Sequence, residues 1–236
     1  MKKIIVLNHK SYLNYEKAKK YPLEINDYIR TDQIVIICPS SPYFPYYKGK
    51  YNFKLGSQSI SDKNVTGELT GEVLKSLEIE YVLINMNNKI NEQEMNYKKI
   101  NGKIKAALDN GIKPIMAIGE TYYEQELNKT ADVIVKQLKD YLKDIEVEQD
   151  IIINYSPNYS YKGNQIPKEE NIYEVVDFIK NYMKRKYNVN TKVIYGGNVT
   201  IDNIEKLEQI TNIDGYLIEE SSINVKEIIN ILNKMK

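Results

Sequence analysis

The sequence predicts a single-domain α/β protein built as a closed (β/α)8 barrel. Eight short apolar runs alternate with longer stretches whose apolar residues recur at helical spacing. Eight such units account for the 236 residues, and α/β barrels commonly occupy a chain of this length as one domain. We therefore expect one domain over residues 1–236. An open doubly wound sheet produces much of the same pattern and stays an alternative.

The eight expected strands are continuous apolar runs. Such runs are typical of parallel strands, because both faces of a parallel sheet are covered. In chain order the expected strands are Ile4–Leu7, Ile34–Cys38, Phe53–Leu55, Tyr81–Ile84, Pro114–Ile118, Ile151–Ile153, Val193–Tyr195 and Tyr216–Ile218.

The stretches between these runs carry the helical pattern. Asn110-Gly111 is a plausible helix stop before the fifth strand. Two rows at helical spacing are Ile100, Ile104 and Leu108, and Val133, Val135, Leu138 and Leu142.

Composition excludes several classes of function. The net charge is +1 with 28% charged residues, so no global field favours nucleic acid or a membrane. No basic platform with interleaved aromatic residues supports nucleic-acid recognition. One histidine, one cysteine and no carboxylate cluster at ligand spacing offer little to a metal ion. We expect no metal, no cofactor, no nucleic acid and no membrane partner.

The cysteine usage and the N-terminus indicate a cytoplasmic protein. Cys38 stands alone in an apolar run and is expected as a small buried hydrophobe. The apolar run that starts at Ile4 is too short for a signal peptide or a membrane span.

The loops after the expected strands carry motifs in a recognisable order. The first strand ends in Asn8-His9-Lys10, and the later motifs keep their spacing to the end of the chain. Together these motifs resemble the triosephosphate isomerase family over the full length, whereas each alone is weak. The later motifs are Gly56-Ser57-Gln58, Thr70-Gly71-Glu72, the segment from Gly111 to Thr121, the segment from Ile194 to Val199, and Asp214-Gly215-Tyr216-Leu217.

The resemblance implies a TIM barrel and places several residues at its mouth. Asn8 and Lys10 match the Asn and Lys that line the family's active site. Gly196 and Gly197 match the motif after the seventh strand, where Asn198 replaces the usual Ser. The family's third loop inserts into a partner subunit, so the resemblance implies a homodimer through the loop from Gln58 to Glu72.

The departures from the family fall at its functional points. Ser156 replaces the catalytic Glu, Met86 replaces the electrophilic His, and Glu219-Glu220 replaces paired glycines whose backbone approaches the substrate phosphate. The family pairs a Glu base with a neutral His. A positioned base is worth roughly 10²–10⁴-fold, and a lost oxyanion donor costs roughly 10²–10³-fold, although the two factors need not multiply. No catalytic residue of the isomerase is therefore intact.

A serine nucleophile is not expected at Ser156. The single histidine, His9, adjoins Lys10 and so faces the opposite side of its strand. No imidazole is available to activate the hydroxyl.

Two interpretations of Glu219-Glu220 compete. In the first, the second carboxylate or a following serine caps a short helix. In the second, a carboxylate occupies the anion pocket, pairs with Lys10, stabilises the fold and excludes phosphorylated ligands.

Three functions stay open. The first, which we favour, is a pseudoenzyme of the isomerase family that serves through binding or assembly. The second is an enzyme with altered chemistry that uses Lys10 with Glu219 or Glu220 on a non-phosphorylated substrate, for example a cationic one. The third is residual interconversion of glyceraldehyde 3-phosphate and dihydroxyacetone phosphate with a different carboxylate as base.

Overall fold

The protein is a closed barrel of eight parallel strands in chain order. The computed structural model describes residues 2–86, 97–147, 151–161 and 166–235. The predicted fold class and all eight strands are confirmed, and the strand ends differ from the predicted ones by at most two residues. The strands are β1 Lys3–Asn8, β2 Gln33–Cys38, β3 Lys54–Ser57, β4 Tyr81–Ile84, β5 Lys113–Ile118, β6 Ile152–Tyr155, β7 Lys192–Tyr195 and β8 Gly215–Ile218.

Pairing of the first and last strands excludes the open-sheet alternative. Strand β1 pairs with β8 from Ile4↔Gly215 to Leu7↔Ile218. At Gly215 the strands approach so closely that a Cβ atom would lie 1.8 Å from the carbonyl oxygen of Ile4. Glycine is therefore required where the barrel closes.

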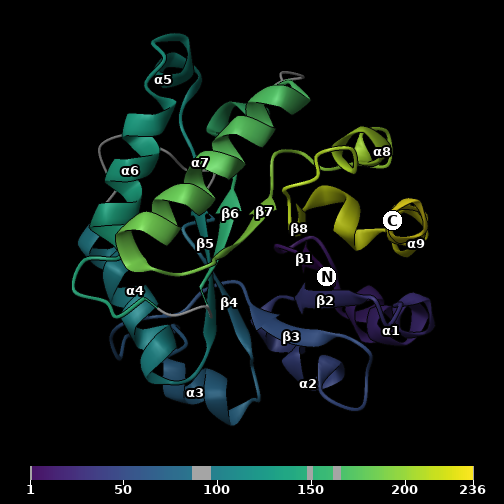
Figure 1. Cartoon of the computed structure of the whole chain (residues 1–236). Coiled ribbons are helices and arrows are strands. Elements are labelled where there is room, and N and C mark those ends of the chain that lie inside the picture. The colour runs from purple at the N-terminus through teal and green to yellow at the C-terminus, as the bar shows by residue number, and fades with distance from the viewer. Residues whose placement is uncertain (1, 87–96, 148–150, 162–165, 236) are drawn as a thin grey trace.

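Helices surround the strands, as Figure 1 shows. Helices α1 and α9 are in contact, next to the β1–β8 junction. The α-helices are α1 Tyr15–Ile25, α2 Phe44–Tyr47, α3 Gly71–Ser76, α4 Tyr97–Asp109, α5 Tyr122–Glu126, α6 Thr130–Tyr141, α7 Glu169–Tyr187, α8 Ile204–Leu207 and α9 Val225–Lys234. Short 3-10 turns are η1 Asn26–Tyr28, η2 Ser41–Tyr43, η3 Asn158–Tyr161 and η4 Glu220–Ile223.

Of the two predicted apolar helix faces, the one on α4 is buried as expected, and the one on α6 is partly misplaced. Ile100 and Ile104 are buried on α4, which ends at Asp109 just before the predicted stop. On α6 the predicted face was partly wrong, because Ile134 is buried there whereas Val133 and Val135 are only half-buried. At 3.6 residues per turn, Ile134 lies on the same side of α6 as Leu138, and the two valines lie on either side of that buried face.

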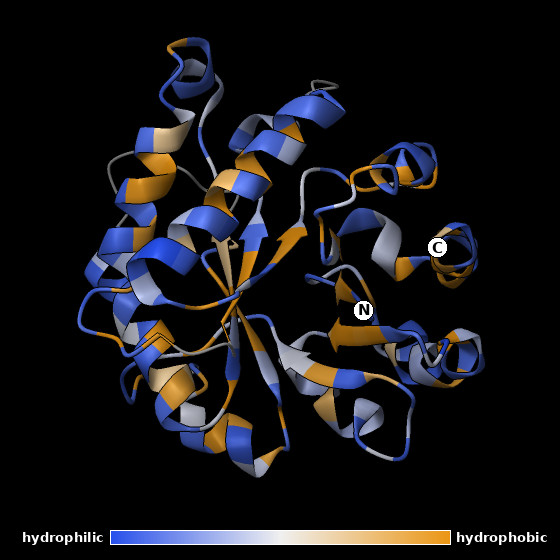
Figure 2. Cartoon of the chain, viewed as in Figure 1, coloured by the Kyte–Doolittle hydropathy of each residue, from blue (hydrophilic) through white to orange (hydrophobic). Residues whose placement is uncertain are grey.

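Strand residues pack in two layers. Alternate residues such as Ile4, Val6 and Leu217 fill the barrel interior, while Ile5 and Leu7 pack outward with the helices. Figure 2 shows apolar residues along the strands and in stripes on the helices. Because side chains alternate along a strand, the interior row of β1 continues into polar residues at the mouth.

Cys38 is fully buried on β2, as predicted. Its sulfur lies beside Gly56, where a Cβ atom would lie only 2.6 Å away. None of the helices in the described ranges is long and apolar enough to cross a membrane.

Candidate functional site at the barrel mouth

Asn8 and Lys10 lie at the C-terminal end of β1, as expected. Lys10 has a left-handed backbone with φ +46°. Its carbonyl oxygen accepts hydrogen bonds from Ser40 Oγ and Gln58 Nε2, both at 2.7 Å. Its amide N–H donates to Asn8 Oδ1 at 3.2 Å. Loops after β2 and β3 therefore fix the backbone from which the lysine side chain extends.

The Lys10 ammonium pairs with Glu219, the residue that follows β8. Lys10 Nζ lies 3.2 Å from Glu219 Oε2, and Asn8 Nδ2 donates to Glu219 Oε1 at 3.2 Å. The glutamate side chain is 8% exposed and the lysine side chain 23%. Burial raises the pKa of Glu219, with a further contribution from Glu220, although Lys10 and Asn8 oppose the shift. Desolvation thus outweighs the attraction of the ammonium.

The pair borders a cavity of about 140 Å³. Its walls include five residues expected from the sequence, which are Lys10, Gly196, Asn198, Glu219 and Glu220. Val199, Thr200, Leu217 and Ser221 complete the walls; Val199 and Leu217 belong to the motifs after the seventh strand and in the eighth strand, but none of the four was expected as a site residue. Two carboxylates face one ammonium, so the cavity disfavours a phosphate dianion.

The capping interpretation of Glu219-Glu220 was wrong. None of the described side chains caps η4, and Asn224 caps α9 by accepting from the Glu227 amide. The Ser221 hydroxyl donates instead to the Glu227 carboxylate. The second interpretation, in which a carboxylate pairs with Lys10, agrees with the observed contact between Lys10 and Glu219.

Ser156 lies beside the cavity rather than on its wall. The side chain is 5% exposed, its amide donates to the Ile118 carbonyl at 2.8 Å, and its hydroxyl donates to the Gly196 carbonyl at 3.2 Å. Gly197 is also not among the lining residues, and a Cβ atom there would lie 2.2 Å from the Tyr195 hydroxyl. The hydroxyl of Ser156 therefore binds the backbone at the end of β7.

His9 points away from the mouth, as predicted. Its ring packs edge-on against Tyr21 at a centroid distance of 4.3 Å and against Tyr47 at 5.9 Å. Burial lowers the pKa of His9 to about 3. The imidazole is thus a neutral packing element that cannot activate Ser156.

Met86 contacts a polar residue that no sequence motif singled out. Asn154 Nδ2 lies 3.8 Å from Met86 Sδ, and Asn154 is fully buried on the interior row of β6. The one sequence feature that could have indicated Asn154 is that a polar amide follows an apolar strand. Gly196 makes room for this amide, since a Cβ atom there would lie 2.4 Å from Asn154 Oδ1. The segment Asn87–Ile90, which follows Met86 directly, lies outside the described residues.

Comparisons with known proteins agree on one family. The family model described as triosephosphate isomerase matches residues 3–235. A triosephosphate isomerase of Alkaliphilus oremlandii is 28% identical over 92% of this chain and 94% of its own length. One from Thermodesulfovibrio yellowstonii is 31% identical over 77% of this chain and 76% of its own length.

Solved structures show the same fold. A crystal structure of triosephosphate isomerase from Bartonella henselae superposes with a TM-score of 0.88 and covers 99% of both chains. At 23% sequence identity, this likeness supports the barrel architecture alone.

Proposed function

The chain belongs to the triosephosphate isomerase family, and from that premise we propose that it is a member without isomerase activity that serves through binding or assembly. The observation that carries the proposal is the contact of Lys10 Nζ with Glu219 Oε2 at 3.2 Å. A lysine that the family directs at its substrate is bound here to a carboxylate of the same chain.

Electrostatics support exclusion of sugar phosphates. A phosphorylated ligand has to displace Glu219 from both Asn8 and Lys10 before it gains their donors. It then meets the carboxylates of Glu219 and Glu220 on the wall of the cavity. Like charges so close together in a partly buried site are costly.

The reacting groups are also replaced. The serine hydroxyl at position 156 donates to a backbone carbonyl and has no pKa suited to a general base near neutrality. The thioether of Met86 has no hydrogen to donate to a developing oxyanion. Both changes support the loss of proton transfer beside a carbonyl group.

A second function has one observation in its favour. The raised pKa of Glu219, caused chiefly by burial, is typical of a carboxylate that acts as a general base or acid. Together with Lys10 on the wall of a 140 Å³ cavity, Glu219 suits proton transfer on a small substrate without phosphate. Saturable turnover of such a substrate that Glu219→Gln abolishes and Glu220→Gln preserves would favour this alternative.

We also infer that the protein works in the cytoplasm as a homodimer joined through the loop from Gln58 to Glu72. The base of the loop is closed by the Ser61 amide, which donates to the Leu69 carbonyl at 2.8 Å. Val65 within it is 51% exposed. Gln58 donates to the Lys10 carbonyl, so assembly through this loop would also stabilise the mouth.

A thermal-shift titration with 2-phosphoglycolate and glycerol 3-phosphate tests the proposal. A ligand that binds the native state but not the unfolded state raises the Tm. Wild-type protein should bind neither phosphate, so its Tm should not rise at millimolar ligand. Glu219→Ala frees Lys10 and should gain a rise, whereas the matched variant Glu220→Ala should not, since Lys10 stays paired. A clear rise for the wild type would overturn the proposed exclusion of phosphate.

A further inference from the structure

A second cavity lies on the flank of the barrel, with a volume of about 430 Å³. Its inner wall is formed by Glu120 after β5, Tyr155 at the end of β6 and Tyr159 on η3. Helices α5, α6 and α7 and the α5–α6 connection supply the rest. It shares no lining residue with the mouth cavity, so inferences about it do not rest on the proposed function.

Glu120 is a buried residue in the lining of this cavity. The residue is 1% exposed. Its Oε1 accepts hydrogen bonds from the Tyr155 hydroxyl at 3.1 Å and from the Tyr159 hydroxyl at 3.5 Å. No side chain or amide in the described part of the chain donates a hydrogen bond of regular geometry to its Oε2, and Glu120 forms no salt bridge with any described residue. A buried acceptor without a partner is costly, so a donor delivered by a ligand has a direct energetic benefit.

The remaining wall indicates which kind of donor fits. Glu174 on α7 adds a second carboxylate at the exposed rim, and none of the described lining residues is basic. Ala131, Val175 and Phe178 form an apolar side. An anion meets two like charges, and a metal ion finds no group of three suitable side chains among the described residues. An ammonium group with a small apolar body matches both the charge and the surface.

We propose that this flank cavity binds an organic ammonium ion, with Glu120 Oε2 accepting from the ammonium group and the apolar side holding the hydrocarbon body. Glu174 attracts the cation to the entrance.

Titration behaviour agrees with this assignment. Burial raises the pKa of Glu120, the residue's own backbone amide and the hydroxyls of Tyr155 and Tyr159 oppose the rise, and Glu124 on α5 adds to it. An ammonium ion binds the ionised form of Glu120, so affinity should increase as pH rises through the pKa of this carboxyl. Glu174 on α7 also lines this cavity.

Calorimetric titration of the full chain with 2-phenylethylammonium, n-pentylammonium and 1,5-diaminopentane tests the proposal. At least one amine should bind, and its neutral alcohol analogue should bind about tenfold more weakly or worse, because it lacks the charge-assisted hydrogen bond. Glu120→Gln keeps an oxygen for the two tyrosines and should weaken the amine by a similar factor. Glu174→Gln should have a smaller effect.

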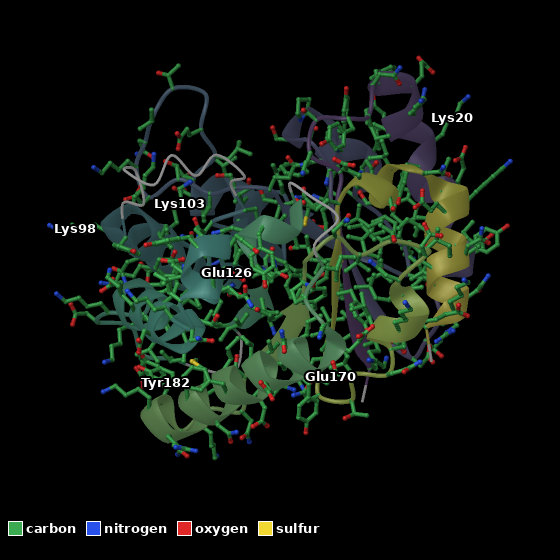
Figure 3. The ribbon with its side chains drawn as sticks, turned by 90° about the horizontal axis from the view of Figure 1, so that it is seen from above. Lys20, Lys98, Lys103, Glu126, Glu170 and Tyr182 are labelled. Atoms are coloured by element: carbon green, nitrogen blue, oxygen red, sulfur yellow. The ribbon has the colours of Figure 1, made fainter. Side chains whose placement is uncertain are left out.

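Glu170→Gln is the matched control. Glu170 is exposed on the same helix, one turn before Glu174, and does not line the cavity; Figure 3 labels it on α7. Its removal should leave amine affinity unchanged. No binding of any of the three amines up to millimolar concentration would overturn the proposal, as would equal binding of amine and alcohol. If Glu120→Gln fails to fold, the comparison of amine with alcohol on wild-type protein still decides.

Discussion

Lys10 and Glu219 depend on each other unequally. The lysine side chain is 23% exposed and can be hydrated alone, whereas the glutamate side chain is 8% exposed. The pKa of Glu219 is raised by burial even with Lys10 beside it. The lysine thus makes burial of the carboxylate tolerable, more than the carboxylate stabilises the lysine.

This asymmetry predicts the order of two substitutions. Lys10→Met should lower the free energy of unfolding at pH 7 by about 1–3 kcal/mol, because it leaves a buried carboxylate without a cation. Glu219→Gln should cost less than about 1 kcal/mol, because its amide oxygen can still accept from Asn8. Urea unfolding measures both, and the opposite order would contradict the account.

His9 predicts a pH dependence of stability. Burial lowers the pKa of its imidazole from 6.5 to about 3, so the unfolded chain binds a proton that the folded chain does not. The folded state therefore loses stability as pH falls below 6.5, by about 2 kcal/mol between pH 7 and pH 5. His9→Phe keeps an aromatic ring against Tyr21 and should remove that loss.

Urea unfolding at pH 7 and pH 5 compares the two proteins. The difference between them isolates His9 from carboxylates such as Glu120 and Glu219, whose raised pKa values act in the opposite direction. The same change of stability with pH in both proteins would count against a neutral buried imidazole.

The sequence predicts which side chains point into the barrel mouth, but it does not predict the contact of Glu120 with Tyr159 at the flank cavity. Alternation along β1 places Asn8 and Lys10 inside and His9 outside, which follows from the sequence alone. The contact between Lys10 and Glu219 also needs the β1–β8 pairing that brings Leu7 beside Ile218. The cluster of Glu120 with Tyr159 depends on the path of a short turn, which carries no periodic pattern.

At the scale of elements, helix α5 depends on its cap. It has five residues, too few to be stable by propagation alone. Thr121 accepts from the Glu124 amide at 3.3 Å, and the Glu124 carboxylate accepts from the Thr121 amide at 2.8 Å. This capping box fixes the helix next to the flank cavity.

Thr121→Ala should loosen α5 by about 1 kcal/mol, the usual cost of a lost cap. Hydrogen exchange measures the effect, and the Leu127 amide, which donates to Tyr123, should exchange about fivefold faster. Thr211→Ala, at an exposed loop position, is the control and should leave α5 unchanged. Equal protection of α5 amides from exchange in wild type, Thr121→Ala and Thr211→Ala would show that the cap does not determine the stability of α5.

Long elements could be predicted, whereas one-turn elements could not. The eight apolar runs fix the strands because burial on both faces leaves a continuous pattern. Helices α2 and α8 have four residues each, which is too short for a 3.6-residue period to repeat. The error at Val133 and Val135 has a related cause, since apolar residues flank both sides of the buried face of α6.

At the scale of the whole molecule, the proposed homodimer makes a testable prediction. The loop from Gln58 to Glu72 exposes Val65, and apolar exposure of this kind suits an interface. Wild-type protein should sediment as a dimer, and Val65→Asp should shift it toward monomer because a charge is buried there. Val73→Asp on α3, outside the loop, is the control. A monomeric wild-type protein at micromolar concentration would exclude the proposed assembly.

The barrel otherwise keeps its architecture while its mouth has changed. The order of the strands in the closed barrel brings Lys10, Gly196 and Glu219 to one cavity. Under the proposed function, replacement of a few side chains at strand ends removes a reaction while the barrel fold stays the same.

Turnover of glyceraldehyde 3-phosphate by purified wild-type protein tests the central claim most directly. A coupled assay with Lys10→Ala as the matched control separates real activity from a contaminating isomerase. We predict that wild type and variant show the same background rate. Turnover by the wild type at a rate typical of enzymes, about 1–10³ s⁻¹, that Lys10→Ala abolishes would contradict the account.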